Sequence, residues 1–142
     1  MTLDAKYETG VVWQDFQHKQ LIDLFKQVKE ARKNKKDQNL YRYTIAFLAM
    51  YVNHHFKLEE QYMEKYAYPD RENHIKEHQG FIKELKLFRL DNFDYSEQGS
   101  DDLVKRMGNW ILDHILGDDK SLGQYILAVE KKQEGTTPPQ ES

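Results

Sequence analysis

Apolar residues recur at helical spacing along most of this chain, and the alternation typical of β-strands is hard to find. Four apolar stripes lie at about 15–33, 39–66, 74–88 and 103–114. The second stripe should end near Ala67, because Pro69 disfavours helix in the residue before it. The pattern predicts four amphipathic helices, each with one apolar and one polar face.

The connections between the stripes are short and polar, so neighbouring helices must run antiparallel. The predicted fold is all-α, an up-down-up-down antiparallel four-helix bundle that occupies residues 1–133 as one domain. A shorter helix is expected to follow from Leu122 to Lys131. Residues 134–142 are polar, include two prolines and are expected to form a disordered tail.

Composition excludes several classes of function. The 142 residues include no cysteine, so disulfides, Cys-ligated zinc, iron–sulfur clusters and thiol catalysis are ruled out, and any metal must be held by nitrogen and oxygen. The formal charge of -3 comes from intermixed acids and bases, which leaves no basic stripe for nucleic acid. The apolar run 45–52 is too short to span a membrane, and the opening residues lack an apolar signal core. We therefore expect a cytoplasmic protein.

Histidines fall on the apolar stripe of every predicted helix. The six in the chain are His18, His54, His55, His74, His78 and His114. One histidine in such a position is usually a core residue hydrogen-bonded to a neighbour. Several imidazoles that meet in one small core would lack partners, at a cost of about 1–3 kcal/mol each. A metal ion would supply the missing partner.

Two of the predicted helices carry a second possible ligand one turn away from a histidine. Glu59 follows His55 by four residues, and His78 follows His74 by four, so each pair projects from one helix face. Either motif alone is common. Both motifs together, with a histidine on each remaining helix, predict a metal site in the bundle core.

Two aspartates, Asp118 and Asp119, follow His114, and either could be the next metal ligand. On an ideal helix Asp118 lies within ~40° of His114, whereas Asp119 is turned away by ~140°. Gly117, however, is a natural place for the helix to loosen, end or form a π-type turn, which would bring Asp119 round. Spacing alone does not choose between the two aspartates.

Four segments stand in a fixed order over residues 10–120: GVVWQDFQH from Gly10, HHFKLEEQYM from His54, YPDRENHIKEHQGF from Tyr68 and WILDHILGDDK from Trp110. Together they resemble the hemerythrin family, specifically its single-domain bacterial members. Gln14 departs from the family pattern, which usually has an aliphatic residue there. The family motif places the ligand directly before Phe, which favours His55 and makes His54 a surface residue or a neighbour of a ligand.

The resemblance implies two iron ions in a non-haem centre. The expected ligands are His18, His55, Glu59, His74, His78, His114 and Asp119. By the resemblance, His74, His78 and His114 would bind one iron, and His18 and His55 would bind the other. Both carboxylates and an oxo or hydroxo group would bridge the two irons. The family spacing H-x-x-x-x-D favours Asp119, with Asp118 in reserve. The two-histidine iron then has five ligands and one open position, where O2 would bind.

Five apolar residues match the family's O2 pocket by their offsets from the ligands: Leu21, Phe56, Trp110, Ile111 and Ile115. An apolar lid there would exclude water and slow the irreversible oxidation of the irons. Each ligating imidazole should donate its other N–H to an outer partner. Asp15, Gln17 and Asp113 lie near enough in sequence, although Asp113 is more simply a capping or solvated residue.

The function implied by the resemblance is reversible O2 binding, for oxygen carriage, storage or delivery in the cell, by a protein that is not an enzyme. The expected partners are O2 and an oxygen-consuming protein, and we expect the chain to be a monomer. One alternative is an O2 or redox sensor that acts through a separate protein partner. Another is a di-iron oxidase or peroxidase, although such sites rely on Glu-x-x-His motifs, and no glutamate precedes a histidine by three residues here.

Overall fold

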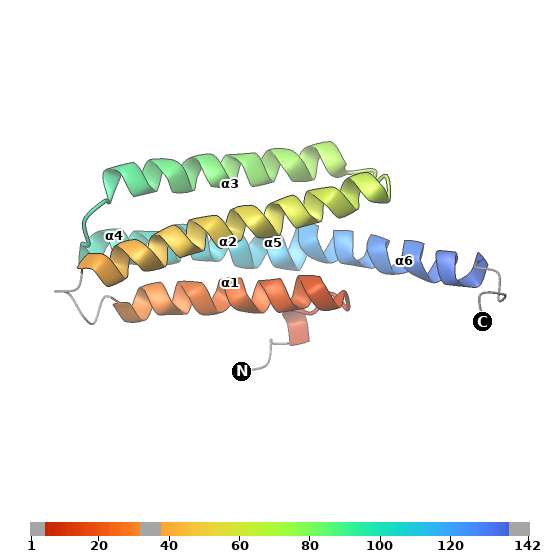
Figure 1. Ribbon diagram of the computed structural model, residues 1–142, viewed down its shortest axis with the longest axis horizontal. Coiled ribbons are helices and arrows are strands. Elements are labelled where there is room, and N and C mark those ends of the chain that lie inside the picture. The colour runs from red at the N-terminus through yellow and green to blue at the C-terminus, as the bar shows by residue number, and fades with distance from the viewer. Residues whose placement is uncertain (1–4, 32–37, 137–142) are drawn as a thin grey trace.

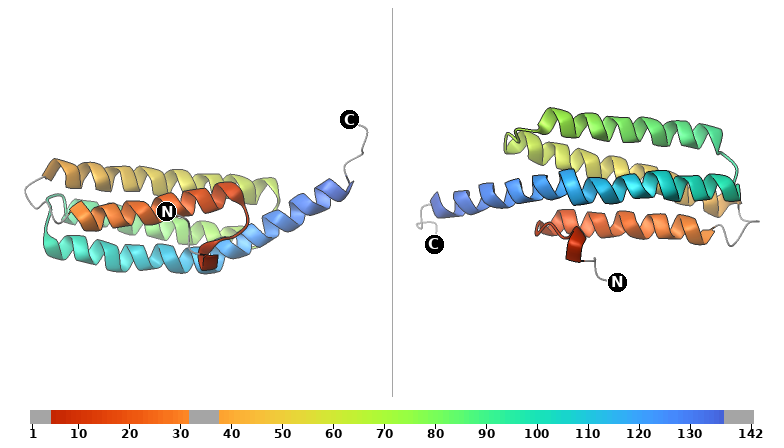
Figure 2. Two further views of the ribbon diagram at one scale, coloured as in Figure 1. Left: turned by 90° about the horizontal axis from the view of Figure 1, so that it is seen from below. Right: turned by 180° about the vertical axis from the view of Figure 1, so that it is seen from behind.

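The structure is a computed structural model that describes residues 5–31 and 38–136. These residues form four long helical rods, with no strand among them. The first three rods are α1 (Val12–Ala31), α2 (Gln38–Lys65) and α3 (Arg71–Asp91). Consecutive rods run in opposite directions and lie side by side (Figures 1 and 2). The all-α, up-down-up-down bundle predicted from the apolar stripes is confirmed.

The fourth rod is continuous but contains two stretches of wider, π-helical winding. It consists of α4 (Glu97–Asp102), the π-helix η2 (Leu103–Gly108), α5 (Asn109–His114), the π-helix η3 (Ile115–Asp119) and α6 (Lys120–Thr136). Backbone angles remain helical at the junctions, with φ -65° and ψ -41° at Lys120. The rod therefore passes through both wider turns without a break.

The C-terminal part of the chain differs from the sequence prediction. The segment 122–131 is not a separate short helix, because it lies within α6, which prolongs the fourth rod beyond the other three (Figure 2). Gly117 widens the helix instead of ending it, and no proline interrupts the rod. Residues 134–136 of the expected tail are the last residues of α6, and 137–142 lie outside the described residues.

The end of α2 follows the prediction from Pro69. Ala67 has a positive φ of 51°, and the Tyr68 N–H donates to the Met63 carbonyl at 2.9 Å. A 6→1 backbone hydrogen bond around a residue in the left-handed conformation is the Schellman motif, which commonly ends helices. It turns the chain into α3 and places α2 and α3 antiparallel.

Two apolar clusters fill the bundle. The larger contains residues such as Leu21, Leu48 and Phe56, and the smaller includes Met63 and Leu122. On α2 the residues between Phe56 and Met63 include a buried charged side chain, so a polar layer separates the two clusters. Within the described segments, no helix combines the length and apolarity that a membrane span requires.

Leu48 is fully buried in the larger cluster, so Leu48→Ala should lower the free energy of unfolding by about 2–5 kcal/mol through lost apolar contacts and a residual cavity. Met50 is 60% exposed on the same helix, and Met50→Ala should change that free energy by no more than about 0.5 kcal/mol. Urea denaturation of both variants measures the difference. Equal losses would contradict the assignment of the core.

Candidate metal centre

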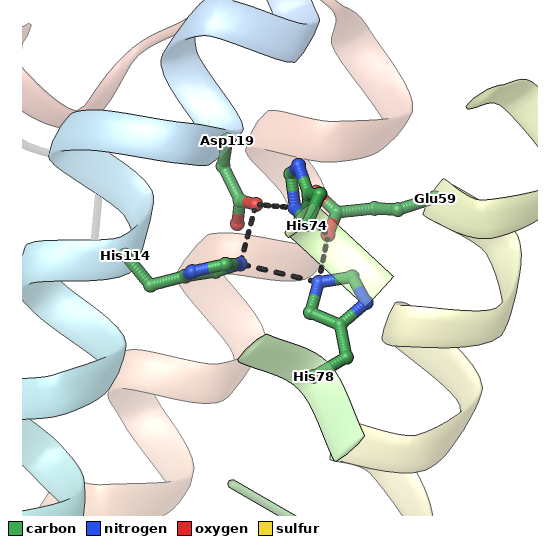
Figure 3. A group of neighbouring side chains, drawn as sticks. All are labelled: Glu59, His74, His78, His114 and Asp119. Atoms are coloured by element: carbon green, nitrogen blue, oxygen red, sulfur yellow. Dashed lines mark hydrogen bonds and ion pairs between the residues drawn. The ribbon is translucent and has the colours of Figure 1, made fainter. Parts of the chain in front are cut away.

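Seven polar side chains meet in the layer between the two apolar clusters. They are His18, His55, Glu59, His74, His78, His114 and Asp119. All four rods contribute, and each side chain belongs to a residue that is at most 5% exposed. Figure 3 shows five of the seven converging on one centre. The structure thus brings together every ligand that the sequence analysis expected.

These side chains form two overlapping groups of potential metal ligands. Glu59 and Asp119 stand with His74, His78 and His114 in one group, and the same two carboxylates stand with His18 and His55 in the other. Within each group the possible ligand atoms lie within 4.8 Å of one another. The two carboxylates are common to both groups, which is the arrangement that a bridged pair of ions requires.

Asp119 presents one oxygen to each histidine group. Its Oδ1 lies 3.0 Å from Nε2 of His74 and 3.0 Å from Nε2 of His114. Its Oδ2 lies 2.8 Å from Nε2 of His18 and 3.6 Å from Nε2 of His55. The carboxylate therefore spans the boundary between the two groups.

Glu59 divides its oxygens in the same way. Oε1 lies 3.1 Å from Nε2 of His78 and 3.6 Å from Nε2 of His74. Oε2 faces the other group, at 3.5 Å from Nε2 of His55 and 3.9 Å from Nε2 of His18. Two carboxylates with matching orientations thus link the three-histidine group to the two-histidine group.

The π-helix η3 decides which aspartate enters the centre. One extra residue in this turn brings Asp119, five positions after His114, onto the inner face, where it is 1% exposed. The side chain of Asp118 is 34% exposed and approaches His114 from outside the centre, at 3.4 Å from its Nδ1. The sequence allowed the helix to loosen, to end or to form a π-type turn at Gly117, and the structure has the π-type turn.

Outer partners orient some of the imidazole rings. Nδ1 of His55 pairs with Oε1 of Gln17 at 2.6 Å, as the sequence had suggested for Gln17. Nδ1 of His78 pairs with Oε2 of Glu60 at 2.9 Å. An imidazole that donates its Nδ1–H outward keeps Nε2 free for a metal. Nδ1 of His18 and Nδ1 of His74 are buried without a hydrogen-bond partner among the described residues, so the outer partner expected for every ligating imidazole is absent for these two.

Two of the outer acids were not predicted from the sequence. Besides Glu60, Glu77 approaches Nδ1 of His114, with its Oε2 at 3.3 Å. Glu60 directly follows the inner glutamate, and Glu77 directly precedes His78. Acids adjacent to expected ligands on the same helix were the signal that could have identified them.

Asp15, Asp113 and His54 take no direct part in the centre. Asp15 accepts from the backbone N–H of Thr9 at 2.7 Å and from that of Gly10 at 3.1 Å, which fixes the entry into α1. Asp113 and His54 are exposed. The capping or solvated role suggested for Asp113 and the surface position suggested for His54 agree with this exposure.

Aromatic rings cover the three-histidine group on its apolar side. The ring of Phe56 stacks on that of His78, with centroids 3.8 Å apart and planes within 4°. Trp110 stacks on His114 at 4.5 Å. The remaining expected pocket residues, Leu21, Ile111 and Ile115, are at most 2% exposed in the larger apolar cluster.

Gln14 lies inside the polar layer rather than at the surface. It is fully buried one turn before His18, and its Nε2 donates to Oε2 of Glu59 at 2.8 Å. In the sequence, Gln14 is distinguished only by its departure from the family pattern. Its contact with a carboxylate on another helix depends on the packing of α1 against α2, which a single sequence does not reveal.

The carboxylates and imidazoles shift one another's protonation strongly. Burial and the Asp119 charge raise the pKa of Glu59, but the His55 charge and hydrogen bonds from His74 and His78 outweigh them and hold it at about 2. Burial also raises the pKa of Asp119, yet His114 and the hydrogen bonds around it keep that pKa well below its usual range. Both acids are therefore ionised at neutral pH.

The donor atoms fit metal ions. Nε2 of His55 is buried without a hydrogen-bond partner among the described residues. Nε2 of His78 faces Nε2 of His114 at 3.1 Å, and a metal ion would satisfy both nitrogens at once. Imidazole and carboxylate ligands suit iron and also accept zinc, manganese or cobalt.

Comparison with known proteins places these features in one family. The model of the hemerythrin HHE cation binding domain matches residues 9–126. The bacteriohemerythrin of Stenotrophomonas maltophilia (strain R551-3) is 30% identical over 114 residues, which cover 80% of this chain and 73% of the relative. The bacteriohemerythrin of Clostridium acetobutylicum is 28% identical, covering 85% and 95%. The myohemerythrin of Theromyzon tessulatum is also 28% identical, covering 82% and 85%.

The metal-free protein should be most stable between about pH 4.5 and pH 6.5. Glu59 has a folded pKa of about 2 against a usual 4.5, so its contribution is present above pH 4.5 and is lost as pH falls toward 2. Burial lowers the pKa of His74, but hydrogen bonds to Asp119 and Glu59 outweigh it and raise the pKa from 6.5 to about 10. Its contribution is complete below pH 6.5 and is lost as pH rises toward 10.

Thermal unfolding of chelator-treated protein across this pH range provides the measurement. The exposed variant His54→Gln should keep the same profile and serves as the control. An unfolding temperature that does not fall on either side of the maximum would contradict the assignment of these charges.

Proposed function

Because this chain belongs to the hemerythrin family, we propose that its seven buried donors ligate two iron ions and that the centre binds O2 reversibly. Its membership of the family makes this chain a non-haem iron, oxygen-binding protein with a di-iron centre. The proposal rests on the orientation of Glu59 and Asp119. Each carboxylate directs one oxygen toward the three-histidine group and the other toward the two-histidine group.

In the proposed ligand set, His74, His78 and His114 hold one iron, and His18 and His55 hold the other. Glu59 and Asp119 bridge them. The two-histidine iron then has one protein ligand fewer than its neighbour. This difference would leave the free ligand position, where O2 would bind, on the side of α1 and α2.

The chain's own contribution to reversibility is a dry, oriented site. The iron pair, when bound, supplies the electrons for O2 binding. Leu21, Ile111 and Ile115 place apolar side chains next to the histidine layer and keep water away from it. Gln17 fixes the ring of His55 through Nδ1, which directs Nε2 inward.

The donor set favours O2 binding over oxidative catalysis. Five imidazoles and two carboxylates make the site rich in neutral nitrogen ligands, whereas ferritin-like di-iron sites depend mainly on carboxylates. We assign the protein to oxygen carriage, storage or delivery in the cell, in accord with the oxygen-binding character of the family.

The first test is the visible spectrum of the reduced, iron-loaded protein before and after exposure to air and again after the gas is removed. We expect two irons per chain and an absorption that appears with O2 and disappears under vacuum, because the apolar surroundings slow irreversible oxidation. Immediate and permanent oxidation would contradict a carrier function and favour a redox role.

The ligand set is tested by Asp119→Asn and Asp118→Asn, studied separately. Asp119→Asn removes a buried charge that reaches both histidine groups, so this variant should lose the iron pair. Asp118→Asn changes a partly exposed side chain and should retain both irons. Iron analysis of the purified variants measures this, and the opposite pattern would show that Asp118 is the bridging residue.

A further inference from the structure

Gln14 connects the entry of α1 to both inner carboxylate residues. Its Nε2 donates to Oε2 of Glu59 at 2.8 Å and to the backbone carbonyl of Asp119 at 3.1 Å. The second acceptor belongs to the last residue of the π-helix η3. One amide group thus contacts the side chain of one inner acid and the backbone that carries the other.

The surroundings determine which way this amide points. Both neighbours within hydrogen-bond distance of Nε2 are acceptors only, namely an ionised carboxylate and a carbonyl. A flipped amide would set its oxygen against the Glu59 carboxylate, which is unfavourable. The donor nitrogen therefore faces the centre, and Oε1 faces away from it.

The contact is specific to one side of the centre. The oxygen that Gln14 engages is Oε2 of Glu59, which faces His55 and His18. The other oxygen, Oε1, lies toward the three-histidine group. The hydrogen bond therefore acts on the half of the carboxylate that faces the two-histidine group.

On the side away from Glu59, the amide of Gln14 packs closely against Gly123 in α6. A Cβ added to Gly123 in α6 would lie 2.8 Å from Oε1 of Gln14 and 2.7 Å from Cβ of Thr9. Oε1 has no hydrogen-bond partner among the described residues, so the buried amide keeps an unsatisfied acceptor. This cost is offset by the charge-assisted bond to Glu59.

We propose that Gln14 is a positioning residue that fixes the Glu59 carboxylate for the iron held by His18 and His55. The inference rests on the ligand set proposed above. With the amide in place, Oε2 is held toward that iron before the metal binds. Without it, the carboxylate can pivot about Oε1, which moves Oε2 away, and the two-histidine iron loses affinity selectively. The three-histidine iron, served by Oε1, keeps its affinity.

The test uses the iron-loaded full chain and follows the iron retained per chain during titration with a ferrous chelator. Gln14→Met keeps an unbranched side chain of similar length and removes both amide donors. One of its two irons should leave at a roughly 10-fold lower chelator concentration, and the other at the wild-type concentration. Gln27→Met, exposed on the same helix, is the matched control and should release both irons as the wild type does.

A second variant reaches the same contact from the opposite side. Gly123→Ala should displace the amide of Gln14 and produce the same early loss of one iron. It keeps the test available if Gln14→Met does not fold. Combined with Gln14→Met, it should add no further selective loss, because the contact that it disturbs is already absent.

The outcomes separate this inference from the ligand set on which it rests. A merely structural role for Gln14 would lower the unfolding temperature and weaken both irons together, and that result would overturn the inference. Unchanged release of both irons from the two variants would do so too. A wild-type chain that binds fewer than two irons would overturn the ligand set itself, and the positioning role with it.

Discussion

Two ionised carboxylates lie at the centre of this bundle, Glu59 with no exposed surface and Asp119 with 1%. An isolated carboxylate in such a place would be strongly destabilising, and two close together would repel each other. Five imidazoles, drawn from every rod, surround the pair. Each rod must therefore present a particular side chain at one level of the bundle, and the rest of the fold serves this requirement.

The apolar clusters on either side of the polar layer make it rigid and dry. The larger cluster supports the aromatic rings that stack on His78 and His114, and the smaller one closes the bundle beyond Glu59. Outer partners such as Gln17 and Glu60 turn the inner nitrogens toward the centre. A ligand set of this kind keeps its geometry because packing, rather than the metal alone, restrains each side chain.

Much of the fold and most of the inner residues could be predicted from local pattern. Helical spacing of apolar residues identified four rods, and histidines on those stripes had to point inward. The pairs formed by His55 with Glu59 and by His74 with His78 were visible because residues four apart share a helix face. The outer acids were overlooked, since an acid beside a ligand reads equally well as a solvated residue. The continuous fourth rod also differed from the prediction, because Gly117 permits either an end or a widened turn.

The sequence by itself determined which faces are buried and hence which histidines enter the core, because helical periodicity is a local property of the chain. Tertiary structure decided what those faces meet. The π-helix η3 selects Asp119 over Asp118, because only the wider turn lets the fourth rod carry both His114 and the aspartate on its inner face. Gln14 becomes part of the centre only when α1, α2 and α6 pack together, since its two acceptors and the space beside Gly123 lie on other helices.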